Sequence, residues 1–231
     1  MEYVYHGSKT HNIKELIPHE SMHGDFVYAT SDKTIAIVMS GKYGNDSIYS
    51  FGRNNKNKPY DLVERVPGAF DKIFANDFSL YYLDASEFKN IHTGFNEVVS
   101  DHSISVLKEE KYDNVMDAIN ELVSNGLIKI YRYPDRPEYI PYDDTDIIDK
   151  LGHYINDLGK SINNINIEYW IFRHPNIENE IREFALKYGY DAPPYDVIKE
   201  IMIKRQEENP EKEYFIDESL HMKEIHSNKT R

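Results

Sequence analysis

The sequence predicts an α+β fold, with strands concentrated in residues 1–110 and helices in the remainder. Short aromatic and β-branched runs separated by loops rich in Gly, Asn and Ser are typical of strands. Beyond residue 110 the apolar residues recur at helical spacing. The 231 residues, 40% of them hydrophobic, are enough to bury a core. We therefore expect a core at 1–110, a helical extension packed on it at 111–210 and a flexible polar tail at 211–231.

Strands are predicted in the first part at residues 3–5, 26–30, 78–83, 96–99 and 104–107. One helical turn is expected at 13–17, ended by Pro18, and a short helix at 34–39 with Asp32 as its N-cap. Within 78–83, Leu80 and Tyr82 alternate with Tyr81 and Leu83, so both faces of this strand are apolar and are expected to be buried. Residues 41–77 are rich in Gly, Asn, Lys and Pro, and we expect a long irregular segment there.

Helices are predicted in the second part at residues 115–123, 146–158, 178–188 and 195–206, with one strand at 127–131. Asp113 is expected to cap the first of these helices and Gly126 to end it. Pro193 and Pro194 precede the last helix, and Pro210 follows it. No repeat of 20 to 50 residues is visible in the sequence.

The formal net charge of −13 argues against nucleic acid as a general partner. Residues 1–110 carry 11 Lys and Arg against 16 Asp and Glu, and the remainder carries 16 against 24. The basic run at 53–58 is interpreted as a solvated loop. No stretch approaches the roughly 18 apolar residues of a membrane helix, and no signal peptide is evident. With no cysteine, we expect a cytoplasmic protein that does not bind membranes.

Several common site motifs are absent, namely Gly-x-Gly-x-x-Gly, the P-loop, His-Glu-x-x-His and the EF-hand spacing. His19 and His23 are four residues apart, but Pro18 and Gly24 flank them and no third ligand has a fixed offset. We therefore expect no metal site. The acids at 143, 144 and 146 are interpreted as an ordinary acidic helix N-terminus.

Three segments remain in which strands end or begin at residues that can bind a nucleotide. The first strand ends at His6-Gly7-Ser8, the second contains Tyr28-Ala29, and Glu97 opens a later strand. Asp84, Glu87 and Asp101 are alternatives to Glu97 as the acidic member of the group.

These segments resemble the ADP-ribosyltransferase superfamily in its His-Tyr-Glu branch, which includes poly(ADP-ribose) polymerases, diphtheria-like toxins and rifampicin ADP-ribosyltransferases. Tyr5-His-Gly-Ser8 is similar to the strand-end His-Gly-Ser/Thr of the family. Val27-Tyr-Ala-Thr30 with Thr34-Ile-Ala36 is similar to its Tyr-Phe-Ala strand and following helix. Asn96-Glu-Val-Val99 is similar to the segment that supplies its glutamate. The resemblance covers about residues 3–107 and implies a split antiparallel β core with small helices that uses NAD as a substrate.

The resemblance also implies a role for each residue. Cleavage of the nicotinamide–ribose bond passes through an oxocarbenium-like state, which the Glu97 carboxylate would stabilise. Gly7 would let the backbone approach the carboxamide, Ser8 would contact the same amide, Tyr28 would stack on the nicotinamide ring, and His6 would bind a ribose hydroxyl. The catalytic set implied is His6, Tyr28 and Glu97, and the NAD-binding set is His6, Gly7, Ser8, Tyr28, Ala29 and Thr34.

Two departures from the family limit what the resemblance implies. Residues 41–77, which would choose the acceptor, match no subfamily, and positions 94 and 95 are Gly and Phe. The acid or glutamine that arginine-modifying toxins carry two residues before the glutamate is therefore missing, which argues against arginine as acceptor. The leading hypothesis is an NAD-dependent mono-ADP-ribosyltransferase with an unknown protein or small-molecule acceptor.

Other functions on the same fold stay open. These are an NAD glycohydrolase, a non-catalytic protein that binds NAD, ADP-ribose or a protein partner, and RNA 2′-phosphate transfer. The last needs several arginines, and residues 1–110 contain only Arg53 and Arg65. Arg132, Arg136 and Arg173 are further candidates for pyrophosphate binding, and Arg136 is interpreted as a surface residue.

Overall fold

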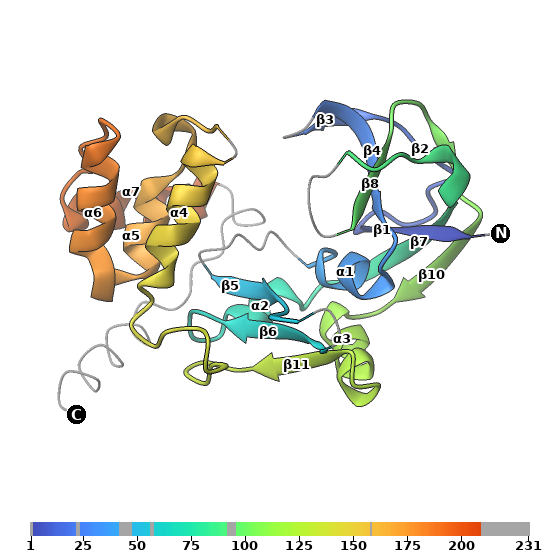
Figure 1. Ribbon diagram of the computed structural model, residues 1–231, viewed down its shortest axis with the longest axis horizontal. Coiled ribbons are helices and arrows are strands. Elements are labelled where there is room, and N and C mark those ends of the chain that lie inside the picture. Colours follow the sequence, from blue (N-terminus) through green and yellow to red (C-terminus); the bar gives the residue numbers. More distant parts are fainter. Residues whose placement is uncertain are drawn as a thin grey trace. The chain divides into compact units, whose positions relative to one another are not determined.

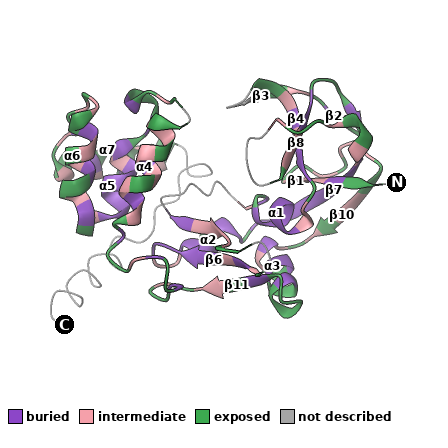
Figure 2. Cartoon of the chain, viewed as in Figure 1, coloured by how far each residue is buried: buried purple, intermediate pink, exposed green. Residues whose placement is uncertain are grey.

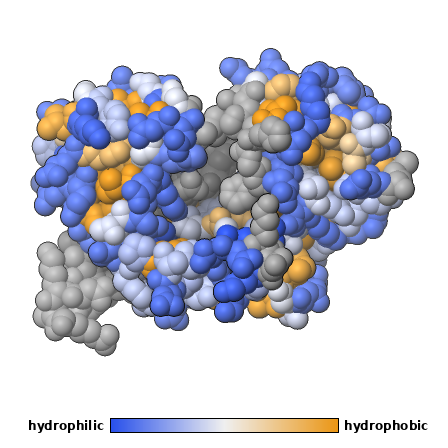
Figure 3. All heavy atoms as spheres, viewed as in Figure 1, coloured by the Kyte–Doolittle hydropathy of each residue, from blue (hydrophilic) through white to orange (hydrophobic). Residues whose placement is uncertain are grey.

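The computed structural model of the chain describes residues 2–21, 24–41, 48–55, 58–91, 96–157 and 159–208. Over these residues the fold is α+β, with antiparallel strands and several helices (Figure 1). The predicted tail at 211–231 lies outside the described residues. On the face shown in Figure 3, hydrophilic residues cover most of the described surface.

The chain divides into two compact units, each formed by two segments. The first unit contains residues 1–42 and 73–128, and the second contains 43–72 and 129–231. This division differs from the boundary expected near residue 110. The segment at 43–72 joins the helical half of the chain, and the segment at 111–128 joins the first unit.

The first unit is built on an antiparallel sheet with the strand order β10-β7-β1-β4-β3, and β8 also pairs with β4 (Figure 1). Its strands are β1 (Tyr3–Ser8), β3 (His19–Ser21), β4 (Gly24–Thr30), β7 (Phe78–Asp84), β8 (Glu97–Ser100) and β10 (Lys108–Tyr112). Strand β7 is buried at six consecutive positions, which confirms the prediction that it is covered on both faces.

A second, two-stranded sheet of the first unit corrects one prediction. Residues 13–17, expected to form a helical turn, contain β2 (Glu15–Leu16), which pairs with β9 (Ile104–Ser105). Leu16 is buried with Ile104 in the core, whereas Ile17 is exposed. This tertiary pairing overrides the local helical spacing. The strand predicted at 104–107 ends at Ser105, and β10, which was not predicted, begins at Lys108.

Helix α1 (Lys33–Val38) forms where it was predicted, between β4 and the region after residue 41. The Asp32 side chain accepts a hydrogen bond from the backbone N–H of Thr34 at 2.9 Å, which satisfies one of the free N–H groups of the first turn. Residues 34–38 are all buried (Figure 2). A 3-10 turn, η1 (Ala85–Glu87), follows β7.

Helix α3 (Val115–Ser124) completes the first unit. Its N-cap is Asn114 and not the predicted Asp113, since the Asn114 side chain accepts from the backbone N–H groups of Met116 and Asp117. Gly126 follows the helix at a φ of 70°, a conformation that glycine adopts without strain.

The second unit combines a three-stranded sheet with a helical cluster. The sheet has the order β11-β6-β5, formed by β5 (Tyr49–Gly52), β6 (Tyr60–Glu64) and β11 (Ile128–Tyr131), with α2 (Ala69–Ile73) after β6. The expectation that residues 41–77 are irregular is therefore wrong. The β5–β6 ladder runs from Tyr49 with Glu64 to Gly52 with Asp61.

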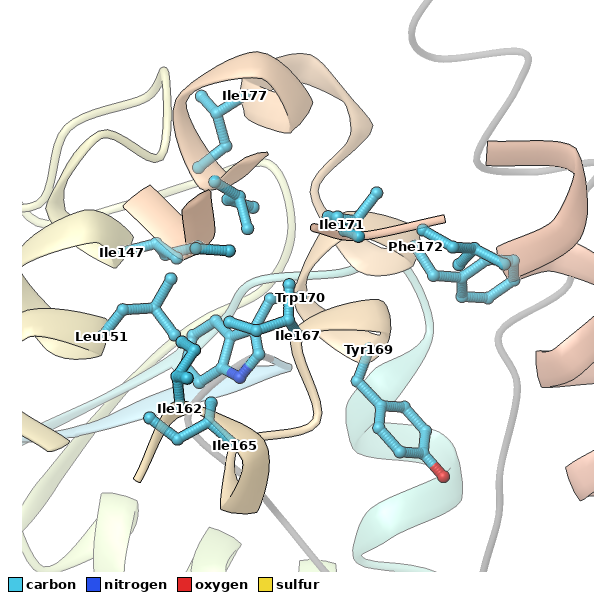
Figure 4. Close-up of a cluster of buried hydrophobic side chains, with 14 of the residues drawn as sticks. Ile147, Leu151, Ile162, Ile165, Ile167, Tyr169, Trp170, Ile171, Phe172 and Ile177 are labelled. Carbon is cyan, nitrogen blue, oxygen red and sulfur yellow. The ribbon is translucent and has the colours of Figure 1, made fainter. Parts of the chain in front are cut away.

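The helical cluster contains α4 (Asp146–Asn156), η2 (Ile162–Asn164), α5 (Ile167–Arg173), η3 (Pro175–Ile177), α6 (Glu178–Lys187) and α7 (Tyr195–Glu208). Helices α4, α6 and α7 were predicted, and α5 was not. Ile147 and Leu151 of α4 point toward Ile167 and Trp170 of α5 in the buried centre of the cluster (Figure 4). Because six of the seven α5 residues are buried, this helix shows no polar face to mark its period.

Candidate functional site

A pocket of about 220 Å³ lies in the first unit, between β1, β4, β8 and α1. It brings together five of the seven predicted site residues, namely His6, Gly7, Tyr28, Ala29 and Glu97. The other lining residues are Tyr5, Thr30, Ile35, Ala36 and Met39. The lining is therefore mostly apolar with a few polar groups, as in many small-molecule sites.

The pocket lies beside the short backbone pairing between β1 and β4. Strand β1 pairs with β7 along all six of its residues, but its register with β4 consists of Tyr5 with Thr30. Thr30 also pairs with Glu97 of β8. Because paired residues of antiparallel strands point to the same face, Tyr5, Thr30 and Glu97 form one row across three strands.

His6 connects the two strands just beyond this row. Its Nδ1 lies 2.7 Å from the carbonyl oxygen of Tyr28. A carbonyl only accepts hydrogen bonds, so Nδ1 carries the proton and the neutral ring leaves Nε2 with a lone pair. Burial lowers the pKa of His6, and nearby His19 lowers it too, against the raising effect of the bond to Tyr28. His6 can thus accept a hydrogen bond from a hydroxyl through Nε2.

The ring of Tyr28 is held by contacts along its own strand and by a neighbouring strand. Its hydroxyl donates to the carbonyl of Gly24 at 2.9 Å. The rings of Phe26 and His19 meet it edge-on, with centroids 6.1 and 5.8 Å away. Tyr28 therefore presents a fixed aromatic surface to the pocket. His23, four residues after His19, lies outside the described residues.

Glu97 is the first residue of β8 and is partly buried. The residue before it, Asn96, has a φ of 52°, and its carbonyl accepts a hydrogen bond from the backbone of Ser31 at 3.3 Å. This turn fixes the start of the strand beside the end of β4. Residues 94 and 95, which carry the departure from the family pattern, lie outside the described residues.

The three alternative acids do not line the pocket. Asp84 accepts hydrogen bonds from the backbone and hydroxyl of Ser86. Glu87 and Asp101 both contact the exposed ring of His102. Among these four carboxylates of the first unit, Glu97 is the one that the structure brings to His6 and Tyr28.

Gly7 has a packing role that the sequence did not reveal. A Cβ at this position would lie 1.9 Å from Oγ of Ser40 and 2.5 Å from the carbonyl oxygen of Ala36. The absence of a side chain thus lets α1 pack directly on β1. This contact places Ile35, Ala36 and Met39 along one side of the pocket.

Two predicted site residues lie outside the lining. Ser8 ends β1, and its hydroxyl accepts a hydrogen bond from the backbone of Thr10 at 3.1 Å. Thr34 is buried in the first turn of α1. Sequence reasoning in turn did not name Tyr5, Thr30, Ile35, Ala36 and Met39 as site residues. All of them except Met39 lie within the segments that resemble the family, and that position was the available signal.

The arginines considered for pyrophosphate binding all lie in the second unit and have partners there. Arg132 pairs with Asp71 at 2.8 Å, and the Arg173 guanidinium lies 4.7 Å from the ring centre of Tyr169. Arg136 was expected at the surface, but it is buried, because it binds Asp144 and the carbonyl of Pro141.

The acids at 143, 144 and 146 are more than an ordinary helix N-terminus. Asp144 is buried and contacts Arg65, Arg136 and His174. Asp146 binds Arg65 as well. Burial alone would raise the pKa of Asp144, but His174 and Arg136 hold it well below its ordinary value. This ionic cluster joins residues 65, 136, 144, 146 and 174 of the second unit.

Comparisons with family models, curated proteins and solved structures found no match to this chain. In the described part of the chain, no helix is both long enough and apolar enough to cross a membrane.

Proposed function

We propose that the chain is an NAD-dependent ADP-ribosyltransferase whose active site is the pocket between β1, β4, β8 and α1. The observation that carries the proposal is the convergence of His6, Tyr28 and Glu97 on one pocket from three strands far apart in the sequence. Strands β1 and β4 are paired at one residue position only, Tyr5 with Thr30, which is consistent with the split β core that the family resemblance implies.

The chemistry of the lining suits the nicotinamide end of NAD. The pyridinium ring of NAD carries a positive charge, and among the described lining residues there is no lysine or arginine, whereas a tyrosine and a carboxylate are present. Cations are attracted to aromatic faces and to carboxylates. A volume of about 220 Å³ is below the range of whole drug-sized ligands, so the pocket fits the ring and part of its ribose.

Each polar group then has a role in breaking the nicotinamide–ribose bond. The lone pair of His6 Nε2 accepts from a ribose hydroxyl, and Tyr28 stacks on the ring. The Glu97 carboxylate binds a ribose hydroxyl and stabilises the positive charge that develops on the ribose as neutral nicotinamide leaves. An acceptor nucleophile then attacks the ribose carbon from which nicotinamide has left. The acceptor is an unidentified protein or small molecule, and water would make the chain a glycohydrolase.

The test is release of free nicotinamide from NAD by the purified full chain, followed by chromatography. We expect Glu97→Gln to lower the rate about 100-fold or more, since it removes a charge that acts in the transition state. Glu87→Gln, at a surface acid of the same unit that pairs with His102, is the matched control and should leave the rate unchanged.

Product analysis separates the related functions. Free ADP-ribose in an amount equal to nicotinamide indicates hydrolysis, and a deficit indicates transfer to an acceptor. NAD that raises the melting temperature without being cleaved would indicate a binding protein. If NAD causes neither nicotinamide release nor a rise in melting temperature, the assignment of the pocket to NAD is overturned.

A further inference from the structure

Met39 is the one sulfur-containing residue among the described residues that line the candidate pocket, and it is exposed. It follows the last residue of α1, and its backbone N–H donates to the carbonyl of Ile35 at 2.9 Å. It lines the pocket together with Ile35 and Ala36. Its exposed fraction is 48%, whereas Ile35 and Ala36 are each only 3% exposed. The thioether therefore contributes an apolar wall and stays accessible to small solutes.

Sulfur chemistry in this chain is confined to methionine, because there is no cysteine among the 231 residues. In the described part of the chain the other methionines are Met116, which is partly buried, and Met202, which is fully buried. Oxidation of methionine follows the exposure of the sulfur. Among these three methionines, Met39 is thus the one that a soluble oxidant reaches most readily.

We infer that Met39 is a peroxide-sensitive modification site that controls ligand binding in the pocket; the control of NAD binding rests on the proposed function. In the reaction, the sulfur lone pair attacks one peroxide oxygen, the O–O bond breaks, and the products are methionine sulfoxide and water. The sulfur is oxidised and the peroxide is reduced. No further reactant is needed.

The sulfoxide changes the wall that meets the ligand. It replaces an apolar group by a polar S=O group in a lining that is mostly apolar. An aromatic ring bound against this wall would have to strip water from the new oxygen, and Ile35 and Ala36 offer no side-chain donor to replace it. We expect the apparent Kd for NAD to rise about tenfold. Reduction by methionine sulfoxide reductases should restore it.

The first measurement treats the full chain with hydrogen peroxide and follows the peptides that contain Met39, Met116 and Met202 by mass spectrometry. We expect Met39 to be oxidised several-fold faster than Met116, with Met202 the slowest. Equal rates at Met39 and Met116 would overturn the inference. This readout does not depend on NAD.

The second measurement compares NAD affinity before and after treatment. Wild type and Met116→Leu should lose affinity, whereas treated and untreated Met39→Leu should agree. Met39→Gln places a polar group at the wall without oxidation and should bind NAD weakly from the start. A peroxide-induced loss that persists in Met39→Leu would overturn the inference. Untreated wild type that has no affinity for NAD would instead contradict the proposed function, and the oxidation rates would still decide whether Met39 is the preferred site.

Discussion

The imidazole of His6 and the backbone of Tyr28 are joined by a 2.7 Å hydrogen bond across the junction of β1 and β4. The register between these strands consists of one residue pair, Tyr5 with Thr30. The side chain of His6 therefore supplies the hydrogen bond to a backbone carbonyl of β4 next to that pair. The same bond fixes the tautomer of His6, with the proton on Nδ1 and a lone pair on Nε2. One contact therefore serves both the sheet and the pocket.

Stability should decrease as the pH falls below about 6.5, the ordinary pKa of histidine. Burial lowers the pKa of His6 in the folded chain, so the unfolded chain binds a proton that the folded chain does not. The stabilisation is complete above the unfolded pKa and is lost as the pH falls through the folded pKa. Urea unfolding from pH 8 to pH 5 measures it, with His6→Gln expected to show a smaller slope.

An identical slope for wild type and His6→Gln would show that His6 does not make the expected contribution.

Gly7→Ala should destabilise the first unit by about 1–3 kcal/mol, the usual cost of overpacking. The new Cβ would meet Oγ of Ser40 at 1.9 Å and the backbone oxygen of Ala36 at 2.5 Å, and the backbone contact cannot be relieved by a rotamer change. Because α1 would be pushed away from β1, NAD affinity should fall as well. Thermal unfolding and NAD titration measure the two effects.

Gly52→Ala is the matched substitution, since Gly52 is also a strand glycine and has no heavy atom within 4 Å of an added Cβ. It should change the free energy of unfolding by less than about 1 kcal/mol. Similar losses in the two variants would mean that the close contact of α1 with β1 is not what requires glycine at position 7.

The sequence predicted best where local signals and tertiary structure agree. Asp32 caps α1 as expected, and β7 is buried on both faces. Strands β5 and β6 escaped prediction because they are only four and five residues long and lie in a segment that is otherwise rich in Gly, Asn and Lys. Their main support is the ladder that joins Tyr49 to Glu64 and Gly52 to Asp61, and a single-sequence reading does not reveal such a register.

The candidate site was predictable in its reactive groups and not in its walls. His6, Tyr28 and Glu97 stand out because their side chains can do chemistry at the ends of strands. Ile35 and Met39 are ordinary residues of a helix pattern, and their place in the pocket depends on how α1 packs over Gly7. The buried ionic cluster was not predictable for a related reason, because the partners Arg65 and Asp144 are 79 residues apart.

Asp144→Asn should cost the second unit about 3–5 kcal/mol of unfolding free energy, the range for breaking a buried ion pair. The substitution leaves the buried guanidinium of Arg136 without its carboxylate partner, and it weakens the contact to Arg65. Urea unfolding is the measurement. The adjacent Asp143 is exposed and accepts hydrogen bonds from the backbone and hydroxyl of Thr145. Asp143→Asn should therefore cost much less than Asp144→Asn, and a comparable loss in both variants would contradict the assigned role of Asp144.

Lys33 should position the helical wall of the pocket through Glu110. A cation at the first position of a helix is unfavourable with respect to the helix dipole, yet Lys33 stands there and donates to Glu110 at 2.8 Å and to the Tyr82 hydroxyl at 2.9 Å. These bonds tie the start of α1 to β7 and β10. Lys33→Met should therefore weaken NAD binding as well as lower stability by about 0.5–1 kcal/mol, as for a partly exposed ion pair.

Lys108 is a matched control because its ammonium group binds the same carboxylate at 2.6 Å, but Lys108 belongs to β10 and not to α1. Lys108→Met should lower stability without changing NAD affinity. Equal NAD affinities for Lys33→Met and wild type would show that α1 holds its place over Gly7 without the ion pair.

The contribution of Glu110 to stability should depend on pH. Burial alone would raise the pKa of Glu110, but Lys108 and Lys33 lower it to about 2. The stability difference between wild type and Glu110→Gln should thus be largest above the unfolded pKa of about 4.3 and should disappear as the pH falls toward 2.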